Sequence, residues 1–203
     1  AAPGGTQGTI LMPGWVGGAN WGGAATDPET GVMYIPSVTS PSVTALVPPP
    51  DPDSSDFRYI RGRPREVPMP QGLPLLKPPY GRVTAIDMNT GEHLWMIPHG
   101  DAPQDQQDAI RNHPLLQGVD NVMANRGRQG QSAMVATSTL LFASGQTADG
   151  TWSLFAIDKE TGERVGTVDI PGSTRYGMSS WMHEGKQYII IQLNDGLAAM
   201  ALP

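Results

Sequence analysis

Three aspartates of the chain occupy the same position in a repeated turn. Asp27, Asp87 and Asp158 each begin the pattern Asp-x-x-Thr-Gly. A carboxylate can act as a general base or bind a metal ion. Within a turn, however, an Asp side chain accepts hydrogen bonds from backbone N–H groups two residues on, and Gly adopts the positive φ that closes the turn. We therefore interpret all three as turn residues and not as catalytic carboxylates.

Other residue types that could do chemistry are sparse. The four histidines do not have a metal-ligand spacing, and we assign surface or structural roles to His93, His99, His113 and His183. The chain has no Cys, which excludes disulfides, thiolate metal sites, a Cys nucleophile and c-type haem attachment. Arg126 or Arg128 could bind the carboxylates of a ligand through paired hydrogen bonds. The alternative is a solvated basic loop.

Short segments of alternating apolar residues, bounded by Gly, Asp, Asn and Thr, predict an antiparallel all-β protein. We expect one helix, over residues 103–112. The segment 84–95 recurs as 155–166, and the turn occurs a third time at 26–31. Strand-turn-strand units that repeat in this way indicate a β-propeller.

The predicted strands group into about three blades. The first contains residues 20–26, 32–38, 82–86 and 92–97, and the second residues 131–137, 140–144, 152–157 and 164–170. The third lacks a fourth strand and contains residues 177–182, 187–193 and 197–202. Residues 9–12 would be the outer strand of a further blade. Since propellers have roughly 4–8 blades, we expect this chain to be part of a larger ring.

Charge and composition exclude some classes of function and mark one unusual segment. The 203 residues carry a formal net charge of −6, which argues against a nucleic-acid partner. No apolar run approaches the roughly 18 residues of a membrane-spanning helix. Residues 39–80 hold 11 of the 20 prolines and four closely spaced arginines, Arg58, Arg61, Arg63 and Arg65. We interpret this stretch as a long insertion between two strands of one blade, either a solvated excursion or part of a site mouth.

Two longer stretches are similar to a known family. Residues 17–36, with Asn20-Trp21-Gly-Gly, and residues 71–87, with Lys77-Pro-Pro-Tyr80-Gly, resemble pyrroloquinoline quinone (PQQ)-dependent dehydrogenases. The membrane-type quinoprotein glucose dehydrogenase branch is the most similar, and Gly185-Lys-Gln-Tyr188 near the end fits the same branch. The resemblance implies that residues 1–203 are the C-terminal part of an eight-bladed propeller. The blades of the N-terminal part would be its partners.

The resemblance also implies an activity, namely oxidation of a sugar or alcohol by hydride transfer to PQQ, with electrons passed to quinone or a cytochrome. Asn20 and Trp21 match the family's PQQ-contacting pair. Their alternative roles are a turn cap for Asn20 and packing between blades for Trp21. The catalytic Asp and the Ca²⁺ ligands are expected in the missing N-terminal part, so this chain alone should be inactive. The expected location is the periplasm, with membrane association through the missing part.

Departures from the family pattern leave other functions open. Trp95 resembles the family's blade-docking Trp, but Gly166 stands at that place in the second copy. The loop at residues 192–196 is short where the family often has a Gly-rich loop. A non-enzymatic propeller that serves as a scaffold for protein interactions is the main alternative. A degenerate dehydrogenase without activity is the other.

Overall fold

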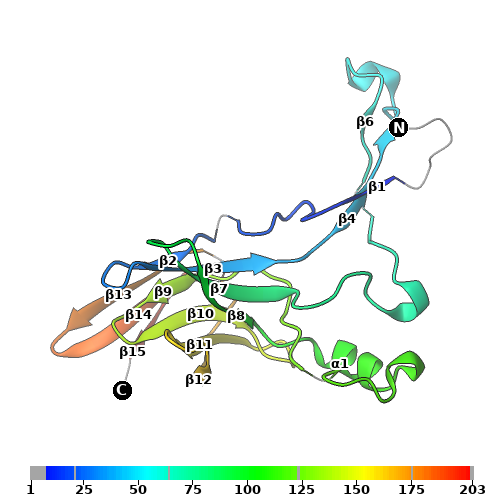
Figure 1. The fold of residues 1–203 in the computed structure, drawn as a ribbon. Helices are drawn as coiled ribbons and strands as arrows, with labels where there is room; N and C mark the ends of the chain where they lie inside the picture. The colour runs from blue at the N-terminus through cyan, green and yellow to red at the C-terminus, as the bar shows by residue number, and fades with distance from the viewer. Residues whose placement is uncertain (1–7, 21, 64, 123, 175, 202–203) are drawn as a thin grey trace. The chain divides into compact units, whose positions relative to one another are not determined.

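The computed structural model describes residues 8–20, 22–63, 65–122, 124–174 and 176–201 (Figure 1). The chain divides into two compact units. We call residues 8–18 and 39–77 the arm, and residues 19–38 and 78–201 the blade unit.

Blade 1 is a four-stranded antiparallel sheet whose strand order is β2-β3-β7-β8. Its strands are β2 (Ala25–Asp27), β3 (Val32–Val38), β7 (Gly81–Asp87) and β8 (His93–Pro98). Strands β3 and β7 are neighbours in the sheet although the arm residues 39–77 separate them in sequence. This grouping of strands confirms the first predicted blade.

Blade 2 repeats the arrangement with the order β9-β10-β11-β12, all antiparallel. Its strands are β9 (Met134–Ala136), β10 (Leu140–Gln146), β11 (Trp152–Asp158) and β12 (Arg164–Asp169). Blade 3 has three strands in the described part of the chain, β13 (Met178–His183), β14 (Lys186–Gln192) and β15 (Leu197–Ala201). The predicted all-β, partial-propeller architecture and the three-stranded third blade are both confirmed.

The innermost strands are shorter than the sequence pattern predicts. Strand β2 begins at Ala25, five residues after Asn20, because a turn with a hydrogen bond from the Gly23 N–H to the Asn20 carbonyl comes first. Strand β9 likewise begins at Met134 instead of residue 131. Strand β9 lies beside β2 and also beside β13. The three inner strands therefore adjoin one another, as they do around the axis of a propeller.

The predicted helix is present as α1 (Gln104–Arg111), followed by a 3₁₀ turn at Pro114–Leu116. None of its residues is buried. In the described part of the chain, no helix has the length and apolar content that crossing a bilayer requires.

The arm is built from two small two-stranded sheets. Strand β1 (Thr9–Leu11) pairs antiparallel with β4 (Ser42–Thr44), and β5 (Leu46–Val47) pairs with β6 (Ile60–Arg61). The expectation that residues 9–12 form the outer strand of a further blade is wrong. Its hydrogen-bonding partner, β4, belongs to the insertion, and the periodicity of a single strand does not specify its partner. Two 3₁₀ turns, Pro52–Ser54 and Pro70–Gly72, complete the arm.

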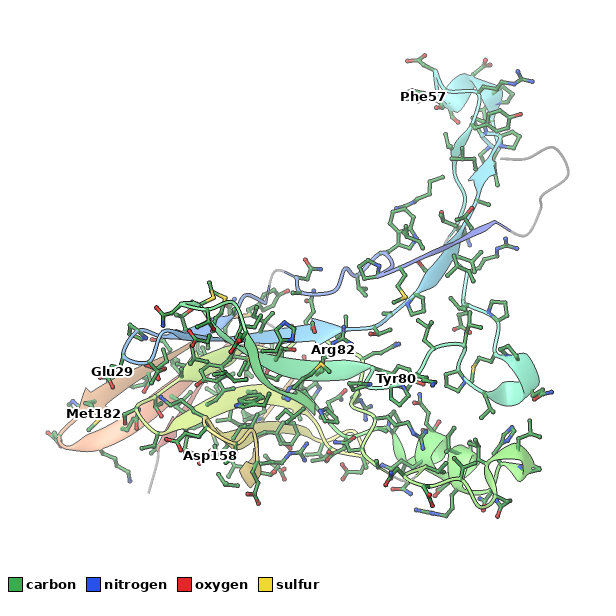
Figure 2. The ribbon with its side chains drawn as sticks, viewed as in Figure 1. Glu29, Phe57, Tyr80, Arg82, Asp158 and Met182 are labelled. Atoms are coloured by element: carbon green, nitrogen blue, oxygen red, sulfur yellow. The ribbon has the colours of Figure 1, made fainter. Side chains whose placement is uncertain are left out.

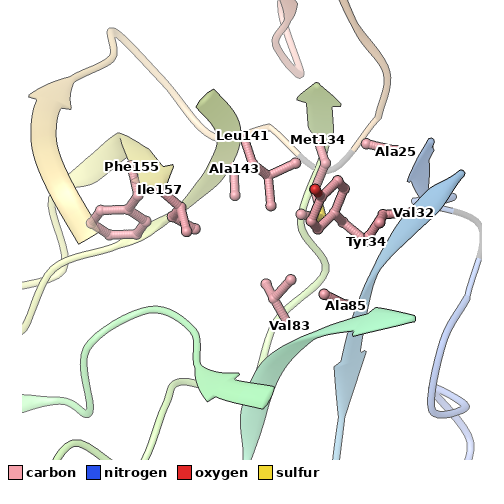
Figure 3. Close-up of a cluster of buried hydrophobic side chains, with 10 residues drawn as sticks. All are labelled: Ala25, Val32, Tyr34, Val83, Ala85, Met134, Leu141, Ala143, Phe155 and Ile157. Atoms are coloured by element: carbon pink, nitrogen blue, oxygen red, sulfur yellow. The ribbon is translucent and has the colours of Figure 1, made fainter. Parts of the chain in front are cut away.

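Two clusters of buried apolar side chains hold the blade unit together. The first lies between blades 1 and 2, where Tyr34, Val83 and Ala85 meet Leu141 and Phe155 (Figure 3). The second joins blades 2 and 3 and includes Phe142, Leu154, Ile170, Ile189, Ile191 and Leu193. Each cluster uses the alternate residues of the central strands, because successive side chains of a strand point to opposite faces.

Candidate functional site

The inner strands β2, β9 and β13 lie side by side. The chain segments that lead into these three strands are the candidate site. We call these the pre-strand segments: residues 19–24 before β2, 125–133 before β9 and 172–177 before β13. All three are rich in glycine. A Cβ atom added to Gly23, Gly130 or Gly177 would meet no atom within 4 Å. These glycines therefore border open space, as the glycine of a repeated turn, Gly91, also does.

Asn20 is half-buried in the first pre-strand segment, where its carbonyl oxygen accepts a hydrogen bond from the Gly23 N–H at 3.0 Å. This backbone bond forms the turn that leads the chain into β2. Trp21, the second residue predicted to contact the cofactor, lies outside the described residues. The role of this pair therefore stays a prediction.

The second pre-strand segment is held in place by backbone contacts with blade 1. The Tyr80 N–H donates to the Arg126 carbonyl at 2.7 Å, and the Arg128 N–H donates to the His99 carbonyl at 2.8 Å. A Cβ on Gly81 would lie 2.0 Å from the Arg128 carbonyl oxygen, so only glycine allows this close approach. The segment is therefore fixed before it reaches β9.

The two arginines of this segment serve its internal structure. Arg126 Nη2 donates to the Val122 carbonyl at 2.8 Å, and Arg128 Nη1 donates to the Thr147 carbonyl at 3.1 Å. Guanidinium groups that already bind backbone carbonyls have fewer donors for a ligand. Both side chains are half-buried and hydrogen-bonded to the protein, so the alternative of a solvated basic loop is wrong, and contact with cofactor carboxylates stays a prediction.

The third pre-strand segment is attached to the short loop between β14 and β15. Thr174 is buried, and its hydroxyl donates to the Gln192 carbonyl at 2.6 Å. The Asn194 N–H and side-chain amide bind Ser173. The loop itself is closed by a hydrogen bond from the Leu193 N–H to the Gly196 carbonyl at 2.8 Å. This loop supports the segment in front of β13.

The repeated turns are at the other end of the blades and have the predicted structural role. Asp87 Oδ1 accepts from the Asn89 N–H at 2.7 Å, and Asp158 Oδ1 accepts from the Thr161 N–H at 2.8 Å. These backbone hydrogen bonds lower the pKa of both carboxyl groups. The closing glycine has a positive φ in all three copies, for example 76° at Gly162. Figure 2 shows Glu29 and Asp158 in two of these turns.

Asp27 differs from the other two because it is also part of a buried ion pair. Its Oδ2 lies 2.6 Å from Lys159 Nζ, and the two residues are only 5% and 8% exposed. The hydrogen bond from Lys159 lowers the pKa of Asp27 from 3.8 to about 2. This contact, which sequence reasoning missed, joins blade 1 to blade 2.

Trp95 has the predicted docking role. Its Nε1 donates to the Lys159 carbonyl at 3.0 Å, and its ring centroid lies 5.7 Å from that of Tyr34. A Cβ on Gly162 would come within 3.0 Å of the indole, so the turn glycine also makes room for the Trp. The docking contact thus depends on both copies of the repeat.

His99 is buried between the same two blades. Its Nε2 lies 2.8 Å from the Ser144 carbonyl, so it donates the hydrogen bond, and its ring is edge-on to Phe155. Burial lowers the pKa of His99 from 6.5 to about 4. The structural role predicted for His99 is confirmed. His93 is on β8, His113 caps a 3₁₀ turn, and His183 ends β13, just beyond the predicted strand 177–182.

A cavity of about 200 Å³ lies beside His99 and is lined by Asp101, Asn125 and Arg164. Arg164 binds both carboxylate oxygens of Asp101, at 2.9 and 3.2 Å, and its guanidinium lies 4.0 Å from the centroid of the Phe155 ring. The charges of this cavity are therefore already paired. Among the described residues, no group of three or more His, Asp or Glu side chains is placed to hold a metal ion.

The sequence as a whole is similar to curated quinoproteins. A probable quinate dehydrogenase (quinone) from Xanthomonas campestris pv. juglandis is 28% identical over 92% of this chain and 25% of its own length. The quinoprotein glucose dehydrogenase of Escherichia coli is 27% identical over 97% of this chain and 27% of its own length. The chain thus spans about a quarter of the length of these relatives.

Solved structures have the same fold. The quinohemoprotein alcohol dehydrogenase from Comamonas testosteroni superimposes with a TM-score of 0.58 at 18% identity, over 95% of this chain and 25% of that protein. A europium-containing methanol dehydrogenase also gives 0.58, over 91% and 27%. The family model for the glucose/ethanol/alcohol dehydrogenase β-propeller domain matches residues 1–189. The chain therefore belongs to the PQQ β-propeller dehydrogenase family.

Proposed function

We propose that this chain contributes one wall of a PQQ site in a dehydrogenase that oxidises a sugar or an alcohol. The observation that carries the proposal is the arrangement of the three pre-strand segments at one end of adjoining inner strands. Asn20 lies in the first of them, within a sequence matched by the PQQ family. The relatives named quinoprotein glucose dehydrogenase and glycerol dehydrogenase large subunit support a sugar or alcohol substrate.

The described residues fit a wall of such a site and not a complete site. Gly23, Gly130 and Gly177 leave free space, and the side-chain amide of Asn20 can donate hydrogen bonds to a quinone or carboxylate oxygen. When bound, PQQ would accept the hydride from the substrate. The chain's own part would be to orient the cofactor and to exclude water from one side of it. Trp21, which follows Asn20, would add a flat apolar wall.

Ca²⁺ is proposed as the second cofactor, with ligands outside these 203 residues. A Ca²⁺ ion takes about 6–8 oxygen ligands, and no suitable carboxylate cluster exists in the described part of the chain. The catalytic base is also proposed to lie outside the chain, because Asp27, Asp87 and Asp158 accept the hydrogen bonds of the repeated turns. The remaining blades are therefore required partners.

Quinone or a cytochrome is proposed as the electron acceptor, and the periplasm as the location. The relative named quinate dehydrogenase (quinone) supports a quinone acceptor, and the one named lupanine 17-hydroxylase [cytochrome c] supports a cytochrome.

The cofactor role of Asn20 can be tested in the purified native protein that contains this chain. Asn20→Ala removes an amide that would bind an ionised or quinone oxygen, which weakens PQQ binding roughly tenfold. PQQ retention is measured by absorbance after equilibrium dialysis against a series of PQQ concentrations. The matched control is Asn89→Ala, which alters an exposed Asn in a blade turn. Equal retention by wild type and Asn20→Ala would remove Asn20 from the site.

The scaffold alternative makes the opposite prediction for the wild-type protein. A scaffold or a degenerate dehydrogenase would show no PQQ absorbance after purification and none after incubation with PQQ and Ca²⁺. A quinoprotein would take up PQQ and reduce a dye acceptor when a sugar or alcohol is added. Uptake without reduction would identify a degenerate dehydrogenase.

A further inference from the structure

The pairing of β9 with β10 ends where side-chain hydrogen bonds take the place of a backbone bond. Its last regular pair is Met134 opposite Ala143, and both side chains lie in the first apolar cluster (Figure 3). At the next pair, the Ser144 N–H still donates to the Ala133 carbonyl at 2.9 Å. The Ala133 N–H donates to the Ser144 hydroxyl oxygen at 2.9 Å, whereas a regular antiparallel pair would use the Ser144 carbonyl. The second pre-strand segment therefore separates from the sheet at Ala133.

The Ser144 carbonyl is bound by two side chains instead. His99 Nε2 donates to it at 2.8 Å, and Ser132 Oγ donates to it at 2.7 Å. All three residues are buried. A carbonyl oxygen has two lone pairs, so these two donors satisfy it. Because a buried polar group without a partner is costly, each member of this network holds the others in place.

His99 is itself fixed on two sides. A Cβ atom on Gly145 would lie 2.6 Å from a ring carbon of Phe155 and 3.2 Å from His99 Nε2, so the glycine makes room for the imidazole. The backbone carbonyl of His99 accepts the hydrogen bond from the Arg128 N–H at 2.8 Å. One residue thus binds the second pre-strand segment with its carbonyl and blade 2 with its ring.

These contacts hold both ends of a short stretch, residues 129–131. The N–H of Arg128 is bound just before it, and the N–H of Ala133 is bound just after it. Within the stretch, Gln129 is exposed and Gln131 is half-buried. Side-chain amides both donate and accept hydrogen bonds, so they suit a ligand with quinone and carboxylate oxygens. The stretch therefore combines fixed ends with polar side chains between them.

We propose that His99 and Ser144 are positioning residues, which hold residues 129–131 in place for the ligand of the candidate site. This inference rests on the proposed function, which makes that ligand PQQ. Both positioning side chains are buried, so they act through the backbone of the stretch. A segment that is already ordered loses less conformational entropy when a ligand binds. Loosening the segment weakens binding although no contacting group is removed.

The first test measures PQQ affinity by equilibrium dialysis of the native protein that contains this chain. His99→Leu removes the ring donor and should weaken PQQ binding roughly tenfold. His99→Gln keeps a donor for the Ser144 carbonyl and should stay within about threefold of the wild type. Ser144→Ala removes a single oxygen atom and should also weaken binding roughly tenfold, which tests the proposal even if His99→Leu does not fold.

Trp95→Ala is the matched control, because Trp95 docks at the same blade junction but on a repeated turn. It should lower the free energy of unfolding, measured by urea denaturation, without changing PQQ affinity. If PQQ affinity falls in step with stability in every variant, Trp95→Ala included, the role of His99 is merely structural and the proposal is overturned.

The same dialysis separates this inference from the proposed function. Wild-type affinity in both His99→Leu and Ser144→Ala would overturn the positioning role and leave the PQQ site standing. A wild-type protein that does not bind PQQ would overturn both.

Hydrogen exchange tests the positioning role without PQQ. In Ser144→Ala, the Ala133 amide loses its acceptor and should exchange roughly tenfold faster than in the wild type. The Gly162 amide, bound to the Asp158 carbonyl in a repeated turn, should be unchanged. Equal exchange of the Ala133 amide in the two proteins would show that other contacts hold the segment, and would overturn the proposal.

Discussion

The two junctions between neighbouring blades are built differently. Blades 1 and 2 share an apolar cluster and, in addition, the Asp27–Lys159 pair, the Asp101–Arg164 pair, docked Trp95 and buried His99. Blades 2 and 3 share the second apolar cluster. Among the described residues, both ion pairs that join different blades lie at the first junction.

The difference follows from the two copies of the repeat. The first copy places Trp95 on its outer strand, and this side chain reaches the turn of blade 2. The second copy has Gly166 at that place, and its neighbours Val165 and Val168 are exposed on β12. A third blade with three described strands offers no outer strand against them. Polar anchors therefore occur where an outer strand meets a turn, which explains why the first junction is the more specific one.

Lys159→Met should produce the largest change, because it leaves the Asp27 carboxylate buried without its cation. We expect the free energy of unfolding at pH 7 to fall by about 4 kcal/mol, measured by urea denaturation. Lys186→Met, on an exposed lysine of blade 3, should change it by less than about 0.5 kcal/mol. Equal effects of the two substitutions would contradict the comparison of the junctions.

The Asp27–Lys159 ion pair also predicts that the wild type loses stability in acid. Because the pKa of Asp27 is lowered from 3.8 to about 2 in the folded chain, its contribution to the free energy of unfolding is complete only above about pH 5. It is lost as the pH falls through 4 toward 2. The variant Asp27→Asn should lack this decrease in the free energy of unfolding, measured by urea denaturation at a series of pH values.

His99 predicts a second pH dependence at the first junction, in a higher range. Its pKa falls from 6.5 to about 4 on folding, so the unfolded chain binds the proton more readily. The free energy of unfolding should therefore decrease by about 3 kcal/mol as the pH falls from 6.5 to 4. His99→Gln can place an amide N–H near the position of Nε2, where it keeps a donor for the Ser144 carbonyl, and should flatten this slope. A slope that persists in the variant would assign it to another group.

Trp95→Ala removes the docking side chain and should cost about 2 kcal/mol, since the indole is only partly buried. Thermal unfolding of wild type and variant measures the difference. The converse substitution, Gly166→Trp, should not stabilise the chain, because nothing described at the second junction receives an indole. A gain in stability on Gly166→Trp would show that the two junctions are equivalent.

The smallest change is expected for the exposed valines of β12. Val165→Thr and Val168→Thr keep the β-branched shape and should alter the free energy of unfolding by less than about 0.5 kcal/mol. A loss above about 1 kcal/mol would mean that these side chains are buried in solution, and that the second junction extends further than the described residues show.

Much of the blade unit was predictable because its signals are local. The Asp-x-x-Thr-Gly turns, the alternation in β10 and β11, and helix α1 all follow from residues close together in sequence. The packing role of Trp95 was also predicted. The length of β2 and β9 was not, because a local turn at Asn20–Gly23 delays β2, whereas contacts of residues 126 and 128 with blade 1 hold the segment before β9.

The sequence by itself determined the repeat, the strand-rich architecture, the family and the expectation that Asn20 and Trp21 face a cofactor. Tertiary structure alone decided that residues 9–11 pair with the insertion, that Lys159 neutralises Asp27, 132 residues away, and that His99 is buried against blade 2. The physical reason is the distance along the sequence over which each interaction acts. Turn chemistry and side-chain alternation act over a few residues, whereas strand pairing and buried charge depend on which distant segments the fold brings together.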